Sequence, residues 1–125
     1  MLRVLLVEDN RIYREAFKGA LHQHFQDISI EEADNAEEAL KKIKAGTPGL
    51  IFVDIRLPGM NGFQLTQRIK KDFSRIPVAI LTGYDLPEYR EAAIQYGACG
   101  FFVKESLKWE EVEALVKSIA VEGNP

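Results

Sequence analysis

Four short apolar runs in this chain of 125 residues each end at a polar residue that can take part in chemistry. The third run, Leu50–Val53, stops at Asp54, and the Pro-Gly and Asn-Gly pairs that follow indicate a tight loop. Four consecutive apolar residues are typical of a strand that is buried on both faces. We therefore expect Asp54 at the carboxyl end of a buried strand, facing a loop.

The other three runs share this form, and a fifth, alternating run at residues 28–32 suits an edge strand. The polar residues that follow the other three runs are Glu8-Asp9, Thr82 and Lys104. Five strands that alternate with five helices predict an α/β, doubly wound parallel sheet, a flavodoxin-like (βα)5 fold with strand order 2-1-3-4-5. In that order the first and third strands are neighbours, so Glu8, Asp9 and Asp54 converge at one edge.

Helical spacing of apolar residues predicts the five helices. They are expected at residues 11–25, 36–45, 63–72, 88–96 and about 106–119. Ile12 and Phe17 are expected on the buried face of the first helix, and Ser106 is expected to cap the last one. We predict a single domain over residues 1–125, in which residues 121–125 form a tail or the start of a linker.

Composition excludes several classes of function. A net charge of −3 and a pI near 5.4 argue against direct nucleic-acid binding, which needs a clustered basic face. No apolar stretch approaches membrane-spanning length, so no membrane contact is expected. Cys99 is the only cysteine, so no intramolecular disulfide can form. We predict a cytoplasmic protein.

The three converging carboxylates require positive charge beside them. Two carboxylates about 4 Å apart repel by roughly 4 kcal/mol at an effective dielectric constant near 20. Mg²⁺, which prefers oxygen ligands, and the Lys104 ammonium are the natural partners. With the Thr82 hydroxyl as a further donor, the set suits phosphoryl transfer with Asp54 as the nucleophile.

The residues at the strand ends resemble the motifs of response-regulator receiver domains of two-component signalling, over essentially the whole chain. The matching stretches are Glu8-Asp9, residues 54–62, Thr82-Gly83 and residues 100–104. The resemblance implies that Asp54 accepts a phosphoryl group from a sensor histidine kinase in a Mg²⁺-dependent reaction, and that the domain is not a conventional enzyme.

The resemblance also implies a role for each residue of the site. Asp9, Asp54 and the backbone carbonyl of Arg56 would hold Mg²⁺, with Glu8 acting through a bound water. Thr82 and Lys104 would bind the phosphoryl oxygens.

The resemblance further implies a switch in which Thr82 moves inward and Phe101 turns into the vacated space. The output surface would be the fourth helix, fifth strand and fifth helix, through which a homodimer can form. Glu105 stands where the family very often has proline, which leaves the aim of Lys104 less constrained. Residues 97–105 are similar to those of receivers attached to helix-turn-helix transcription domains, so DNA would be bound only through a separate effector domain.

Other functions stay open beside this one. The chain can be a stand-alone receiver, or an interaction module that works without phosphorylation. A phosphatase of the haloacid-dehalogenase type would need an Asp-x-Asp motif after the first strand, where this chain has Glu8-Asp9. A nucleotide- or flavin-binding module would need a glycine-rich phosphate loop at the same place.

Overall fold

The computed structural model describes residues 1–122 of the chain, with side chains described as far as Ile119. Strands and helices alternate throughout, as predicted. The elements are, in order, β1 (Leu2–Val7), α1 (Arg11–His24), β2 (Ile28–Ala33), α2 (Ala36–Ala45), β3 (Leu50–Val53), α3 (Gly62–Asp72), β4 (Val78–Thr82), α4 (Pro87–Gln95), β5 (Gly100–Val103) and α5 (Trp109–Glu122).

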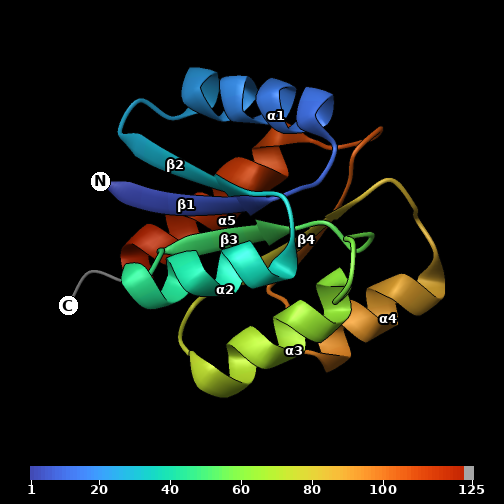
Figure 1. The fold of residues 1–125 in the computed structure, drawn as a ribbon. Coiled ribbons are helices and arrows are strands. Elements are labelled where there is room, and N and C mark those ends of the chain that lie inside the picture. The colour runs from blue at the N-terminus through green and yellow to red at the C-terminus, as the bar shows by residue number, and fades with distance from the viewer. Residues whose placement is uncertain (123–125) are drawn as a thin grey trace.

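The five strands form one parallel sheet in the order β2-β1-β3-β4-β5. Helices α1 and α5 cover one face of the sheet, and α2, α3 and α4 cover the other (Figure 1). This arrangement confirms the predicted doubly wound, flavodoxin-like fold. It places the carboxyl ends of β1 and β3 side by side, because Val7 pairs with Val53.

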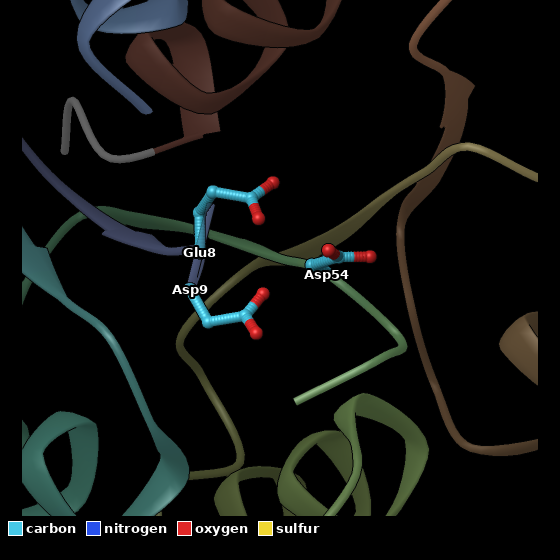
Figure 2. Close-up of side chains that lie close together, drawn as sticks. All are labelled: Glu8, Asp9 and Asp54. Carbon is cyan, nitrogen blue, oxygen red and sulfur yellow. The ribbon is translucent and has the colours of Figure 1, made fainter. Parts of the chain in front are cut away.

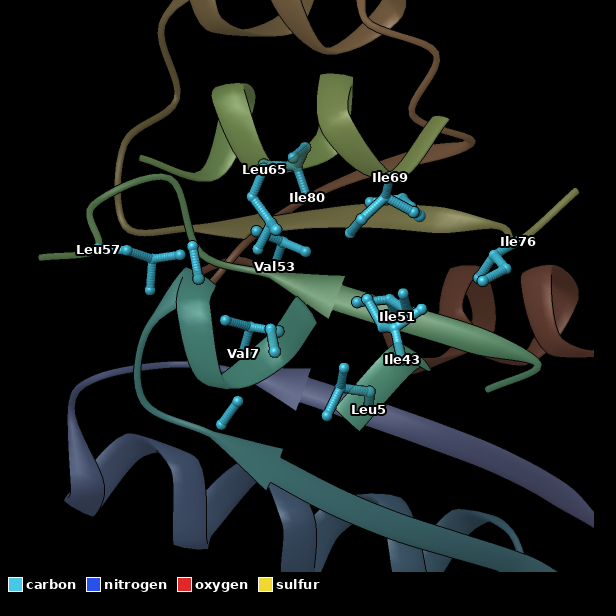
Figure 3. Packing of buried hydrophobic residues seen from close by; sticks show 14 of the residues in the cluster. Leu5, Val7, Ile43, Ile51, Val53, Leu57, Leu65, Ile69, Ile76 and Ile80 are labelled. Carbon is cyan, nitrogen blue, oxygen red and sulfur yellow. The ribbon is translucent and has the colours of Figure 1, made fainter. Parts of the chain in front are cut away.

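The sheet separates two hydrophobic cores, and β3 contributes to both because its side chains alternate between the faces. Ile51 and Val53 belong to the core under α2, α3 and α4, which Figure 3 shows. Leu50 and Phe52 belong to the core under α1 and α5. All four side chains are fully buried, and burial of each stabilises the fold by about 1.5–3 kcal/mol. The end of β3 is therefore a firmly held point in the molecule.

The prediction that Ile12 lies on the buried face of α1 is wrong, because its side chain is 85% exposed. The buried face of α1 is defined by Tyr13, Phe17 and Leu21, which follow one another at intervals of four residues. Ile12 lies about 100° around the helix from Tyr13, outside this stripe.

The prediction that Ser106 caps α5 is also wrong. Its amide donates to the carbonyl of Val103 in a turn, and α5 begins three residues later, at Trp109. The amides of Glu111 and Val112 donate to the Lys108 carbonyl, so the first helical turn is built on Lys108. The helix continues to Glu122, and residues 123–125 of the expected tail lie outside the described residues.

Gly62, at the start of α3, lies against the backbone of the segment that follows β3. Its amide donates to the Ile55 carbonyl over 2.8 Å. A Cβ at this position would overlap the Asp54 carbonyl oxygen and lie 2.7 Å from Ile55 Cα. Only glycine allows this close approach, which ties the first turn of α3 to the backbone of Asp54.

Within the described residues, no helix combines the length and the apolar character that crossing a bilayer requires.

Candidate phosphoacceptor site

The three carboxylates predicted to converge do meet at the carboxyl edge of the sheet. Glu8 and Asp9 follow β1, and Asp54 follows β3. One carboxylate oxygen from each lies within 4.8 Å of the others. Figure 2 shows the carboxylates of Glu8 and Asp9 facing that of Asp54. The Asp54 amide donates to the Val7 carbonyl over 3.0 Å, which continues the ladder between β1 and β3 into the site.

Burial differs among the three acidic residues. Glu8 is fully buried and Asp54 is buried, whereas Asp9 is exposed. Burial raises the pKa of Glu8, and repulsion by Asp54 adds to this shift, although Lys104 and the Asn10 amide oppose it. The fold therefore keeps a carboxylate at a position where, without a metal ion, its charged form is disfavoured.

Lys104 supplies positive charge from the opposite half of the sheet. It follows β5, and its amide donates to the Thr82 carbonyl over 2.8 Å. Its Nζ lies 2.5 Å from Glu8 Oε1 and 3.2 Å from Asp54 Oδ2. Burial alone would lower the pKa of Lys104, but the contacts with Glu8 and Asp54 raise it overall, so the group stays an ammonium.

The donor set fits a divalent cation. Glu8 Oε2 accepts a hydrogen bond from the Asn10 amide, whereas the buried Oε1 accepts none from the described residues despite its ion pair with Lys104. A buried carboxylate oxygen with spare capacity, beside Asp9 and Asp54, offers the hard oxygen ligands that Mg²⁺ prefers. The acidic cluster is therefore consistent with a divalent-metal site.

Thr82 ends β4 and is fully buried. Its Oγ1 accepts a hydrogen bond of 3.3 Å from the Tyr84 amide. A Cβ on the adjacent Gly83 would meet no atom within 4 Å, so the space beside Thr82 is open. The threonine lies at the same edge of the sheet as the carboxylates, between the ends of β3 and β5.

Phe101 lies in β5, directly opposite Ile80 of β4, and its side chain is half-buried. The Arg90 guanidinium lies over its ring, with the Arg90 carbon 4.8 Å from the ring centroid. Arg90 also forms an ion pair of 2.7 Å with Asp85, in the loop after β4. Phe101 is thus linked through Arg90 to the loop that follows Thr82.

Arg56 contacts both Asp54 and the loop after β4. Its amide donates a long hydrogen bond of 3.4 Å to Asp54 Oδ1. Its exposed guanidinium lies over the Tyr84 ring, 4.0 Å from the centroid. The loops after β3 and β4 are therefore in contact through Arg56 and Tyr84.

Sequence reasoning missed two residues at the site. Arg14 donates from Nη1 to the Glu8 carbonyl over 2.7 Å and pairs with Glu32. The Tyr13 ring lies beside Lys104 Nζ, 4.4 Å from its centroid. Burial raises the Tyr13 pKa to about 12, with repulsion by Glu8 adding to it.

The histidines take no part in the site. The His24 ring stacks on Trp109 at 4.3 Å, and its Nδ1 lies 3.1 Å from Glu113 Oε1. Trp109 also stacks on Phe17, so it packs within the molecule. His22 is exposed.

Comparison with known proteins gives relatives along most of the chain. A gliding motility regulatory protein of Myxococcus xanthus is 40% identical over 120 residues, which are 94% of this chain and 15% of that protein. The "Probable transcriptional regulatory protein NarL" of Mycobacterium tuberculosis is 32% identical over 115 residues, which are 92% of this chain and 53% of that protein. The chain thus spans about half, or much less, of the length of these curated relatives.

Solved structures share the fold over the whole chain. A two-component response regulator from Clostridium difficile has a TM-score of 0.87 at 27% identity, with 100% of both chains covered. A DNA-binding response regulator of the LuxR family from Staphylococcus aureus has a TM-score of 0.84 at 28% identity, covering 95% of this chain and 98% of that one. The family model of the response regulator receiver domain matches residues 4–117. Because this match runs from β1 into α5 and the fold agrees with it, the chain belongs to the family of response regulator receiver domains.

Proposed function

We propose that this receiver domain is the phosphoacceptor of a two-component system, in which Asp54 takes a phosphoryl group from a sensor histidine kinase. An Asp54 carboxylate oxygen forms the new P–O bond while the P–N bond of the kinase's phosphohistidine breaks, and the imidazole leaves with the bonding electron pair. The observation that carries the proposal is the placement of Lys104 Nζ 3.2 Å from Asp54 Oδ2, at an edge that also holds Glu8 and Asp9.

The membership in the receiver family suggests a role for each residue around Asp54. Asp9, Asp54 and the backbone carbonyl of Arg56 would hold Mg²⁺, and Glu8 would act through a bound water. Mg²⁺ offsets the negative charge of the phosphoryl oxygens when it is bound. The oxygen-only donor set and the spare capacity of Glu8 Oε1 support this role.

Two further side chains bind the phosphoryl group itself. The Lys104 ammonium already lies on Asp54 and binds a phosphoryl oxygen when one arrives. The Thr82 hydroxyl donates to a second oxygen, for which Gly83 leaves space. The reaction modifies the domain itself, so we propose a signalling switch and not a conventional enzyme.

The output passes through Thr82 and Phe101 to the surface made by α4, β5 and α5. The contact between Arg90 and Phe101, together with the ion pair from Arg90 to Asp85, supports this path because it joins β5 to the loop after β4. The same surface can form a homodimer.

The relatives suggest what the output controls. The Mycobacterium tuberculosis relative is named a transcriptional regulatory protein and the Staphylococcus aureus structure a DNA-binding response regulator. We propose that residues 1–125 form a single cytoplasmic receiver domain that controls an attached DNA-binding domain.

The test is the intact mass of the protein after incubation with Mg²⁺ and acetyl phosphate. We expect one Mg²⁺-dependent phosphoryl addition in the wild type and none in Asp54→Ala. Asp27→Ala is the matched control, since Asp27 is an exposed aspartate at the opposite edge of the sheet, and it should be phosphorylated like the wild type. A folded wild type that gains no mass would refute the proposal and favour a phosphorylation-independent module.

A further inference from the structure

Three groups surround the Lys104 ammonium, and only two of them are carboxylates. Besides Glu8 Oε1 and Asp54 Oδ2, its Nζ faces the Tyr13 ring at 4.4 Å from the centroid. The Lys104 side chain is only 17% exposed, so the contact with the ring is largely sheltered from water. A cation over an aromatic ring is held more strongly when both are sheltered in this way.

The position of the Tyr13 ring is fixed by α1 and its neighbours, independently of Lys104. The Tyr13 backbone amide donates to Asn10 Oδ1 over 3.1 Å in the first turn of α1. The ring stacks on Phe17 at 5.9 Å, and Phe17 in turn packs against Phe52 at 5.2 Å and Trp109 at 5.6 Å. Tyr13 is therefore part of a packed aromatic cluster, and it offers the lysine a fixed surface.

The Lys104 side chain needs a surface that holds its ammonium in place, because its backbone lies two strands away from that of Asp54. It follows β5, whereas Asp54 follows β3, and β4 lies between these two strands. A lysine side chain that reaches across a neighbouring strand loses much rotamer freedom when it is held in one position. The residue after Lys104 is Glu105, which does not restrict the backbone as a proline would.

We propose that Tyr13 is a positioning residue, which holds the Lys104 ammonium at Asp54 through the face of its ring. The proposal rests on the proposed function, because it adds a residue to the same phosphoacceptor site. Tyr13 acts through Lys104 and touches neither the phosphoryl group nor the metal. Since the contact is made by the ring, phenylalanine can replace tyrosine here, whereas leucine cannot.

The test combines a rate with a measurement on the lysine itself. The rate of phosphorylation by acetyl phosphate at saturating Mg²⁺ is compared for the wild type, Tyr13→Leu and Tyr13→Phe. Tyr96→Leu is the matched control, because Tyr96 is also a half-buried tyrosine beside a helix but packs against Phe63 on the other face of the sheet. In parallel, NMR records the Lys104 Cε protons, which the face of an aromatic ring shields.

We expect phosphorylation to be about three- to tenfold slower in Tyr13→Leu. Tyr13→Phe and Tyr96→Leu should stay within about twofold of the wild type. The Lys104 Cε protons should lose their upfield shift in Tyr13→Leu and keep it in Tyr13→Phe.

A Tyr13→Leu rate equal to that of the wild type would overturn the proposal, as would a Tyr13→Phe variant that is equally slow. Unchanged Lys104 resonances in Tyr13→Leu would do the same. A wild type that takes no phosphoryl group is a failure of the proposed function, and it is distinguishable because the Lys104 resonances still report whether Tyr13 holds the ammonium.

Discussion

Replacement of Gly62 by alanine should destabilise the protein, although alanine is the better helix former. The added Cβ would lie 2.7 Å from Ile55 Cα and 2.8 Å from the Asp54 carbonyl carbon, where ordinary contacts are 3.4–4 Å. Both neighbours are backbone atoms in a buried segment, so neither can move aside by a side-chain rotation. Either α3 or the segment after β3 has to shift.

Two opposing effects set the magnitude. A glycine-to-alanine change within a helix stabilises by about 0.5–1 kcal/mol through backbone entropy and propensity. Overpacking of this kind costs about 1–3 kcal/mol or more. The alanine side chain would also strain the hydrogen bond from the residue 62 amide to the Ile55 carbonyl, which adds about 0.5–1.5 kcal/mol to the loss of stability. The cost of the steric overlap exceeds the gain in helix propensity, and we expect the free energy of unfolding to fall by about 2–3 kcal/mol.

Thermal and urea unfolding of the Mg²⁺-free protein measure this change. For a chain of this length the Tm should fall by about 4 °C for each kcal/mol, hence by about 8–12 °C in Gly62→Ala. Gly19→Ala is the control, because Gly19 is exposed within α1 and an added Cβ there meets no atom within 4 Å. That variant should be more stable by up to about 1 kcal/mol. A Gly62→Ala protein as stable as the wild type would refute the steric argument.

Two other substitutions test the site and its output. Glu8→Gln should raise the free energy of unfolding of the Mg²⁺-free protein at pH 7, because burial raises the pKa of Glu8 and its charged form is disfavoured in the fold. The wild type loses stability as the pH rises through the raised pKa of Glu8, so the stability advantage of Glu8→Gln should shrink when the pH is lowered below that pKa. Urea unfolding in the presence of a chelator at several pH values measures this advantage. An advantage that grows in acid would contradict the argument. Phe101→Ala should cost about 1–3 kcal/mol of stability and leave Asp54 phosphorylation within about threefold of the wild type. Phosphorylation-dependent NMR shifts in α4 and α5 should disappear in that variant, and shifts as large as those of the wild type would show that the output bypasses Phe101.

The strand ends were predictable because their pattern is local and strong. Leu50–Val53 is apolar without interruption and stops at Asp54, so its burial and the place of the carboxylate both follow from the sequence. The parallel order of the strands then brings Glu8 and Asp9 to the same edge. Lys104 was predicted at this edge for the same reason, and the structure adds its contacts with Glu8 and Asp54.

The errors and omissions arise where one side chain depends on several elements. The spacing of Ile12 fits a helical apolar stripe, but the spacing of apolar residues alone does not decide whether Ile12 or Tyr13 begins the buried stripe. Ser106 is a good capping residue, but it lies in a turn that begins at Val103, and α5 starts only at Trp109, so Ser106 is not at the helix N-terminus. The contact between Tyr13 and Lys104 joins α1 to the residue after β5, so no local pattern could reveal it.

The stacked rings along α1 have a practical, optical consequence. Trp109 is the only tryptophan of the chain, and it lies between the rings of His24, at 4.3 Å, and Phe17, at 5.6 Å. All of the indole fluorescence therefore comes from one position, at the contact between α1 and the start of α5. Phe17 also stacks on Tyr13, whose ring contacts the Lys104 ammonium, so only two rings separate the fluorescent indole from this ammonium. The domain thus carries its own spectroscopic label, and docking on α1 or unfolding of α5 can be followed without attaching a dye.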